Sequence, residues 1–204
     1  CDDDVCGSAA NQENIRRYYK EACALKRGLG SKDAFRKLEL LMKQAGLSPN
    51  DREVVKHALL REETTSHPAC AIGLPGGKIM TGKTTDLMNS AAAVLLNSLK
   101  EMAGIDHKEH LISPEALAPI TELKKKYLHS QDPRLNMEEV LTALSISSAS
   151  NENAKSAMDQ IGNLKGLDMH STVLLSGSDE NVTRKLHMNL TSEPKYEFSR
   201  TFQL

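Results

Sequence analysis

The sequence is poor in aromatic residues, has no tryptophan and has no long apolar segment. Aromatic side chains make up 3% of the 204 residues, and Lys plus Arg (26) nearly balance Asp plus Glu (27). A membrane-spanning helix needs about 20 apolar residues in succession, and no segment approaches that length. Balanced charge provides no overall field that would attract nucleic acid or an anionic membrane. We therefore expect a soluble protein with no nucleic-acid partner and no membrane partner.

Cysteine is also scarce, and its spacing indicates no pairing. The four thiols are Cys1, Cys6, Cys23 and Cys70, without the C-x-x-C pairs that are typical of zinc sites. Scattered cysteines favour reduced thiols in a cytosolic protein. We expect four free thiols, no bound metal and a cytoplasmic location. Because the chain starts at Cys1 without an initiator methionine or a leader, we interpret it as a piece of a longer protein.

The first 66 residues carry the pattern of three amphipathic helices. Apolar residues recur at helical spacing over residues 11–29, and glycines end this stretch. Ser31 is a typical N-cap for a second helix that stops at Gly46. The predicted inner face of that helix consists of Phe35, Leu38, Leu41, Met42 and Ala45. Ser48 followed by Pro49 predicts a third helix, so we expect residues 1–66 to form an N-terminal helical segment.

The remainder of the chain alternates strand and helix patterns. Residues 69–81 predict a β-hairpin, and Thr85 or Asp86 is expected to cap a long helix that ends before Gly104. Later patterns predict helices after Ser113, Asn136 and Asn151, a buried strand at 171–175, and a helix at 178–188 followed by a tail. We expect residues 67–204 to form an α/β core. The fold class is then α/β or α+β and helix-rich, with a small sheet that contains the hairpin and is packed by capped helices.

Residues 77–84 (GKIMTGKT) match the P-loop pattern G-x-x-x-x-G-K-[ST] in full. A P-loop needs a buried strand that ends at the first glycine, followed by a loop of small residues whose N–H groups face a phosphate. Here the spacer residues 78–81 suit a pleated strand, and Pro75, Gly76 and Gly77 before them suit a tight turn. We predict the second strand of a hairpin rather than a P-loop.

A weaker anion site is predicted where the hairpin meets the following helix. Its candidate residues are Lys78, Gly82, Lys83, Thr84 and Thr85. Free N–H groups and the positive end of a helix attract anions. The alternative, which we favour, is that the two threonines only cap the helix and that the lysines are solvated.

Histidines suggest two further sites. His107 and His110 lie among carboxylates and could bind zinc or shuttle protons, but they lack the i, i+4 spacing of helical ligands, so we favour a solvated loop. His67, His170 and Ser171 are candidates for a pocket. Together with Asp168 or Asp179, the pair His170 and Ser171 could form a nucleophile and base. Adjacent strand residues point to opposite faces, however, and we favour a satisfied or ligand-facing His170.

Five strings resemble a known bacterial family. They are residues 14–19 (NIRRYY), 39–46 (ELLMKQAG), 81–84 (TGKT), 110–115 (HLISPE) and 179–182 (DENV). The resemblance is to the family known as domain of unknown function eighteen-forty-six, from about Cys6 to Tyr196. It implies the C-terminal part of a protein more than twice this long. The missing N-terminal part of that protein looks like an α/β nucleotide-binding domain with a glycine-rich phosphate loop, and no catalytic residue carries over.

Two functions of different class remain. The first, which we prefer, is a C-terminal accessory or substrate-side domain of a cytosolic bacterial enzyme that acts on a nucleotide or a phosphorylated metabolite. This chain would then hold no cofactor, and the full-length protein would bind the nucleotide. The second is a non-catalytic packing or oligomerisation domain, with a homo-oligomer as its assembly. In both, the missing N-terminal domain of the same protein is a partner.

Overall fold

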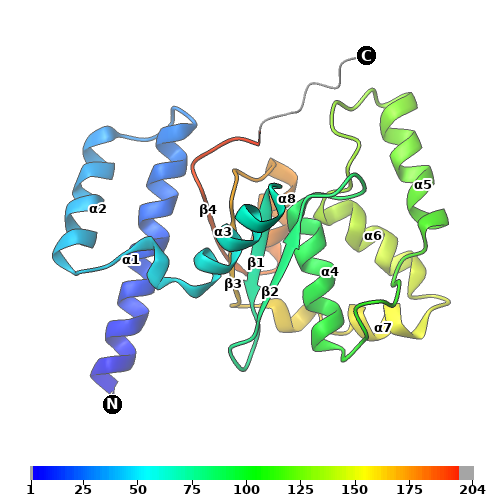
Figure 1. Ribbon diagram of the computed structural model, residues 1–204, viewed down its shortest axis with the longest axis horizontal. Coiled ribbons are helices and arrows are strands. Elements are labelled where there is room, and N and C mark those ends of the chain that lie inside the picture. Colours follow the sequence, from blue (N-terminus) through cyan, green and yellow to red (C-terminus); the bar gives the residue numbers. More distant parts are fainter. Residues whose placement is uncertain (1, 198–204) are drawn as a thin grey trace.

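The computed structural model describes the backbone of residues 2–197 and the side chains of residues 7–197. Helices dominate these residues and surround a small sheet (Figure 1). The α-helices are α1 (Asp2–Lys26), α2 (Lys32–Gln44), α3 (Glu53–Thr65), α4 (Ser90–Met102), α5 (Pro114–Glu122), α6 (Met137–Ser147), α7 (Glu152–Met158) and α8 (Gly177–Lys185). The strands are β1 (Ala69–Gly73), β2 (Ile79–Lys83), β3 (Asp168–Ser171) and β4 (Asn189–Ser192). No helix of the described residues is long and apolar enough to cross a membrane.

The four strands form one mixed sheet in the order β2-β1-β3-β4. Strand β1 is antiparallel to both of its neighbours, whereas β3 and β4 are parallel and are connected through α8. His170 of β3 therefore lies between Ala71 of β1 and Thr191 of β4. The predicted fold class, a helix-rich α/β fold with a small sheet, is confirmed.

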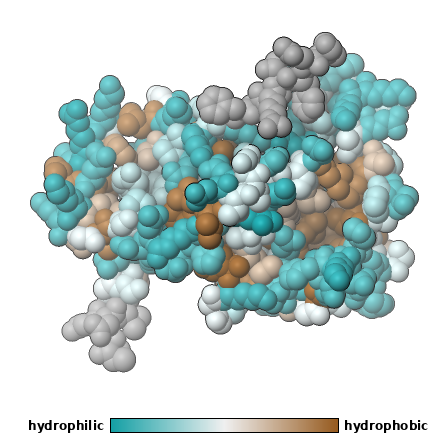
Figure 2. Space-filling model, in the orientation of Figure 1, coloured by the Kyte–Doolittle hydropathy of each residue, from teal (hydrophilic) through white to brown (hydrophobic). Residues whose placement is uncertain are grey.

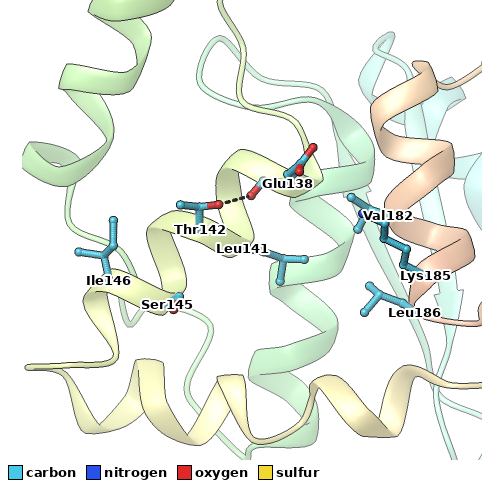
Figure 3. A pocket seen from close by; sticks show the side chains of 8 residues that line it. All are labelled: Glu138, Leu141, Thr142, Ser145, Ile146, Val182, Lys185 and Leu186. Atoms are coloured by element: carbon cyan, nitrogen blue, oxygen red, sulfur yellow. Dashed lines mark hydrogen bonds between the residues drawn. The ribbon is translucent and has the colours of Figure 1, made fainter.

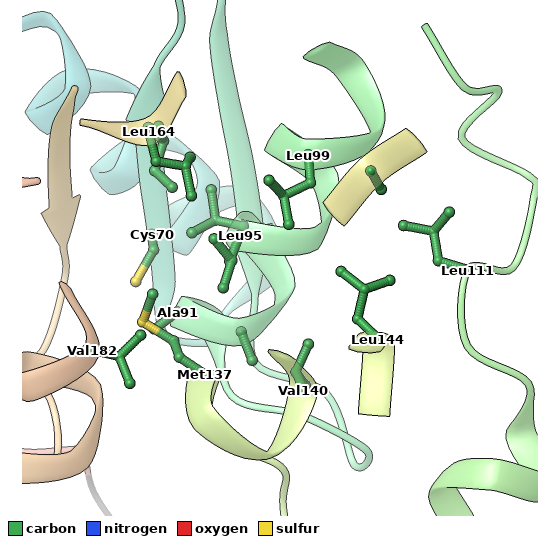
Figure 4. Close-up of a cluster of buried hydrophobic side chains, with 14 of the residues drawn as sticks. Cys70, Ala91, Leu95, Leu99, Leu111, Met137, Val140, Leu144, Leu164 and Val182 are labelled. Atoms are coloured by element: carbon green, nitrogen blue, oxygen red, sulfur yellow. The ribbon is translucent and has the colours of Figure 1, made fainter. Parts of the chain in front are cut away.

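The two faces of the sheet are covered by different helices. Helix α3 packs on β1, β2 and β3, and α1 packs on β4. Helix α4 covers β1 and β2 from the opposite side. The main apolar core lies on this α4 side, where Cys70, Leu95, Met137 and Leu164 are fully buried (Figure 4). Ala71 points the other way and packs with Val54 and Ala58 of α3, as the alternation of side chains along a strand requires.

The hairpin prediction is confirmed and the P-loop pattern is coincidental. Residues 79–83 form β2 and pair in register with β1, from Ile79 opposite Gly73 to Lys83 opposite Ala69. The turn contains Gly76 and Gly77 at φ of +84° and +85°, a backbone region that glycine adopts without steric cost. Because residues 79–83 are extended and bonded to β1, they form no loop that could surround a phosphate.

Most predicted helix starts are observed. Ser31, Ser113, Asn136 and Asn151 each accept a hydrogen bond from a backbone N–H in the first turn of their helix. Ser48 caps a single 3-10 turn, Pro49–Asp51, before α3 begins at Glu53.

The predicted start of α4 is wrong. Asn89 is the N-cap, and its side chain accepts from the N–H of Ala92. Thr85 instead stabilises a turn, because its hydroxyl accepts from the N–H groups of Leu87 and Met88. Met88 then pairs with Leu135 in an isolated bridge, which keeps this stretch extended up to Asn89.

Three other predictions require correction. Strand β3 ends at Ser171, where a strand had been predicted to begin, and residues 189–192, expected as a tail, form β4. Both strands are only four residues long, so their pattern is too short to locate their bounds. In α2, Met42 is the buried residue, whereas Leu41 is 52% exposed. The observed α2 therefore has a much narrower inner face than its apolar pattern predicts.

The prediction of free thiols is confirmed for the two cysteines whose side chains the structure describes. Cys23 and Cys70 are free thiols, and burial raises the pKa of each to about 11. The side chains of Cys1 and Cys6 lie outside the described residues.

Candidate functional site

Polar side chains, most of them buried, gather between α1, the start of α3, and strands β3 and β4. We call this group the seam cluster. Its members are Tyr19, Arg52, Asp168, His170, Thr191 and Glu193. Charged and ionisable groups are rarely buried unless they are paired, so this cluster is the most unusual chemical feature of the described residues.

Arg52 is the most deeply buried charge of the cluster. It lies between the 3-10 turn and α3 and is 1% exposed. Its Nη2 atom donates to the carbonyl oxygen of Asn189 at 2.6 Å and lies 3.1 Å from Oδ1 of Asp168. Burial lowers the pKa of Arg52, and the nearby Asp168 carboxylate offsets part of that effect. Arg52 thus joins the start of α3 to both parallel strands.

His170 occupies the centre of the sheet and is 0% exposed. Its Nδ1 atom lies 2.9 Å from Oγ1 of Thr191, and its Nε2 atom lies 3.4 Å from Oε1 of Glu193. That second separation is an electrostatic contact rather than a well-formed hydrogen bond. The ring of Tyr19 packs on the imidazole with centroids 5.0 Å apart. Burial lowers the pKa of His170, and Glu193 only partly compensates.

Glu193 connects the histidine to helix α1. The hydroxyl of Tyr19 donates to Oε1 of Glu193 at 2.9 Å. Burial alone would raise the pKa of Glu193, but His170, Tyr19 and Lys195 together lower it below its ordinary value. Burial and the same carboxylate raise the pKa of Tyr19. Glu193 is therefore ionised near neutral pH, and Tyr19 keeps its proton.

Thr191 allows His170 to change its charge without moving. The threonine hydroxyl lies 2.9 Å from Nδ1 of His170 and 3.3 Å from the carbonyl oxygen of Met169. It can donate to Nδ1 of neutral His170, or accept from Nδ1–H of the charged form and donate to Met169. Either state leaves Nδ1 with a partner. The arrangement can thus hold or release one proton inside the fold.

A second set of polar contacts lies beside the seam cluster, near the end of β3. Glu62 of α3 accepts from the hydroxyl of Thr172 at 2.9 Å and from Nζ of Lys195 at 2.7 Å. Thr172 in turn accepts from the N–H of Ala69 at the start of β1. These contacts connect α3, the sheet and the segment after β4, and they leave Glu62 doubly bonded.

The structure separates the predicted nucleophile and base. Ser171 pairs with Cys70 on the α4 side of the sheet, opposite to the side of His170, and its hydroxyl donates to the carbonyl oxygen of Val173. Asp168 contacts Arg52. Ser171 and His170 therefore do not form a nucleophile and base pair, and Nε2 of His170 has no hydrogen-bond partner among the described residues. His67 precedes β1, and its Nδ1 atom lies 2.6 Å from the carbonyl oxygen of Thr65.

Asp179 is buried at the meeting point of three helix starts. Its carboxylate accepts from the N–H of Met137, from Nδ2 of Asn89 and from the hydroxyl of Ser176, each at 2.8 Å. These donors belong to the first residue of α6 and to the N-caps of α4 and α8. Positive helix ends favour an anion, and the Asp179 side chain supplies it. Asp179 is therefore a structural anchor whose carboxylate is bonded to three helix starts.

The predicted anion site required the N-terminus of the following helix. That helix, α4, begins only at Ser90, after the predicted residues. Lys78 forms an ion pair with Glu101, and Lys83 ends β2. Gly82 is required by packing, since an added Cβ would lie 2.3 Å from the backbone nitrogen of Val94. Thr84 is buried, and its hydroxyl has no hydrogen-bond partner in the described part of the chain. Anion binding at these residues stays a prediction.

His107 and His110 show no metal-binding arrangement. His107 contacts Glu101 at 3.3 Å and is more than half exposed, and His110 is also exposed. Within the described residues, no three His, Cys, Asp or Glu side chains lie close enough to hold a metal ion.

Sequence reasoning missed most of the seam cluster. Tyr19 lies in the segment 11–29, which was expected only as an apolar helix pattern, and Arg52 and Glu193 belonged to no recognised motif. An arginine two positions before the apolar pair Val54 and Val55 was the one available signal. Nothing in the sequence indicated that Glu193 would meet a tyrosine 174 positions earlier.

A groove in the described part of the chain lies away from the seam cluster. It has a volume of about 430 Å³ and runs between α6 and α8 on the other side of the sheet (Figure 3). Leu141, Val182 and Leu186 line it, and Glu138 and Lys185 stand at its rim.

Comparison with known proteins assigns the two parts of the chain. Residues 50–202 match the C-terminal model of the domain of unknown function DUF1846, and residues 1–46 match its N-terminal model. UPF0371 protein CE2832 of Corynebacterium efficiens is 47% identical over 196 residues, which are 96% of this chain and 40% of that protein. UPF0371 protein SUB1165 of Streptococcus uberis is 45% identical over 202 residues, or 99% and 41% of the two chains. The chain spans about two fifths of the length of these relatives, and it belongs to the DUF1846 family, whose members carry the name UPF0371 protein.

Proposed function

We propose that this chain is the C-terminal accessory part of a longer cytosolic bacterial enzyme that acts on a nucleotide or a phosphorylated metabolite. Its own contribution is positional. It fixes the last two helices of the N-terminal family domain on the sheet of the C-terminal domain, while the phosphate chemistry belongs to the N-terminal domain. The nucleotide or phosphate ligand rests on the family resemblance, and the positional role rests on the seam cluster.

The observation that carries the positional role is the composition of the seam cluster. Tyr19 belongs to the segment that matches the N-terminal family model, whereas His170 and Glu193 belong to the segment that matches the C-terminal model. Two further contacts cross the same boundary. Arg27 pairs with Glu180, and Sγ of Cys23 donates to the carbonyl oxygen of Ser192 at 3.1 Å. A buried, bonded boundary of this kind holds two parts in one orientation.

The reactive groups of the described residues support position over catalysis. His170 is fully buried, and a general base must come within hydrogen-bond reach of its substrate. Cys23 and Cys70 have raised pKa values of about 11, so little thiolate is present near neutral pH. The buried histidine and the two thiols therefore support a role inside the fold.

A ligand screen on the longer protein tests the enzymatic part of the proposal. Melting temperature is measured with nucleotides and with sugar phosphates, because a ligand that binds only the folded state raises it. We expect at least one phosphorylated compound to stabilise the protein and an unphosphorylated nucleoside to have no effect. No stabilisation by any phosphorylated compound at millimolar concentration would contradict the enzymatic role.

Lys83→Ala in the same screen tests the predicted anion site. Hydrogen bonds to charged groups contribute about 1.5–3 kcal/mol, so loss of such a contact weakens binding of the best ligand by at least tenfold. Lys155→Ala, an exposed lysine of α7, is the matched control. Equal affinity in both variants would remove Lys83 from the site.

A non-catalytic oligomerisation domain is the second candidate function. The α6 and α8 groove favours it, because Ile146 at its edge is 68% exposed (Figure 3) and exposed apolar surface is typical of protein contacts. Sedimentation equilibrium separates the two proposals. A stable oligomer that Ile146→Glu dissociates, together with a negative ligand screen, would favour this alternative.

A further inference from the structure

Helix α2 makes few tertiary contacts. It lies at the outside of the molecule, and its main contact is α1 (Figure 1). Met42 is its buried residue and joins Ile15, Tyr19 and Val55 in a small core. An amphipathic helix is normally stabilised by burying a wide apolar stripe, and here the stripe is only partly used.

The side of α2 that faces away from α1 carries two adjacent leucines. Leu40 is 59% exposed and Leu41 is 52% exposed. The space-filling view shows hydrophobic atoms among hydrophilic ones on this part of the surface (Figure 2). Basic side chains surround the two leucines: Arg36 and Lys37 lie one turn before them, and Lys43 lies one turn after. We call these five residues the α2 outer face.

We infer that the α2 outer face is the docking surface for the remainder of the N-terminal family domain in the longer protein. This inference rests on the proposed function, because it names the surface through which that domain is held. Residues 1–46 match the N-terminal family model, yet they pack on the C-terminal sheet through one side of α1. The other side of the α1 and α2 pair is left for the domain to which these helices belong by sequence.

The composition of the surface defines its partner. Two leucines require an apolar patch, and three basic side chains around them require carboxylates at the rim of that patch. The proposed partner surface belongs to the part of the longer protein that this sequence does not include, because this sequence covers only 40% of UPF0371 protein CE2832. The alternative occupant is a second copy of this chain. In that case, burial of the α2 outer face depends on protein concentration.

Thiol labelling tests the assignment directly. Leu40→Cys and, as the control, Leu128→Cys are made separately in the longer protein. Both side chains are more than half exposed in the structure. Each variant is treated with a maleimide, and modification at the new cysteine is followed by peptide mass spectrometry, which distinguishes it from the natural cysteines. We expect the new thiol of Leu40→Cys to react at least tenfold more slowly than that of Leu128→Cys.

Three outcomes decide the matter. Slow labelling at position 40 that is unchanged over a hundredfold range of protein concentration supports the inference. Slow labelling that becomes fast on dilution overturns it in favour of a second copy. Equal rates at the two positions overturn it outright. None of these results depends on a nucleotide or phosphate ligand, so failure of this inference is distinguishable from failure of the ligand screen.

Discussion

The phenol of Tyr19 donates a hydrogen bond to the carboxylate of Glu193 at 2.9 Å, although the two residues are 174 positions apart in the sequence. The same carboxylate oxygen faces Nε2 of His170 at 3.4 Å. The Glu193 carboxylate thus contacts Tyr19 of the N-terminal family segment and His170 of the C-terminal sheet. Helix α1 is held by this shared carboxylate as well as by apolar contact through Ile15.

The seam cluster predicts that acid weakens the fold. The pKa of His170 is lowered in the folded state, so the unfolded chain binds its proton more readily and stability falls as pH drops below the ordinary value of 6.5. The lowered pKa of Glu193 continues the loss below 4.5. The raised pKa of Asp179 acts in the opposite direction, since it adds stability toward low pH.

A comparison with His170→Gln isolates the histidine. One proton contributes a slope of at most about 1.4 kcal/mol per pH unit. We expect the unfolding free energy of the wild type, minus that of the variant, to decrease between pH 7 and pH 5. Urea unfolding at four pH values provides the measurement. A difference that stays constant over this interval would show that His170 does not titrate as described.

Asp179→Asn is expected to destabilise the protein by about 2–4 kcal/mol. The carboxylate is 1% exposed and accepts three hydrogen bonds, and an amide would direct its own N–H₂ group at one of those donors. Asp86→Asn, at an exposed position, is the control and should change the free energy by less than about 0.5 kcal/mol. Chemical unfolding of both variants decides, and a similar small effect in both would mean that the three helix starts do not depend on a buried anion.

Gly82→Ala tests the close approach of β2 and α4. An added methyl group would lie 2.3 Å from the nitrogen and 2.7 Å from the Cα atom of Val94, and backbone atoms cannot move away independently. We expect a loss of about 2–4 kcal/mol, at or above the upper end of ordinary overpacking. Gly162→Ala adds the same methyl group where no atom lies within 4 Å, and its melting temperature should match that of the wild type. A neutral Gly82→Ala would instead favour a functional reason for this glycine.

The elements with strong local signals were predictable from the sequence. Ser31, Ser113 and Asn136 begin helices because their side chains satisfy free N–H groups of the first turn, and this chemistry is local. Likewise, the two glycines of the hairpin turn occupy positive φ. The start of α4 could not be predicted, because the bridge between Met88 and Leu135 joins positions 47 residues apart and extends the chain past Thr85.

The candidate site was much less predictable. His170 was recognised as a residue of interest, but of its three suggested partners only Asp168 belongs to the seam cluster, whereas Ser171 pairs with Cys70 and Asp179 anchors the helix starts. Strand β4 has only four residues, and it is stabilised by pairing with β3 and by α1 rather than by its own pattern. Without β4, neither Thr191 nor Glu193 could be placed beside the histidine. Arg52 required the same strand, since it donates to the carbonyl oxygen of Asn189.

The most direct test of the account is a double-mutant cycle between Tyr19 and Glu193. The variants are Tyr19→Phe, Glu193→Gln and the double variant, and the free energy of unfolding is measured for each by urea titration at pH 7. Tyr18→Phe, the neighbouring tyrosine, serves as the control for loss of a hydroxyl. Because the hydrogen bond involves a charged acceptor in a largely buried setting, we predict a coupling energy of about 1–2 kcal/mol. A coupling energy below about 0.3 kcal/mol would contradict the claim that this contact fastens the N-terminal segment to the sheet.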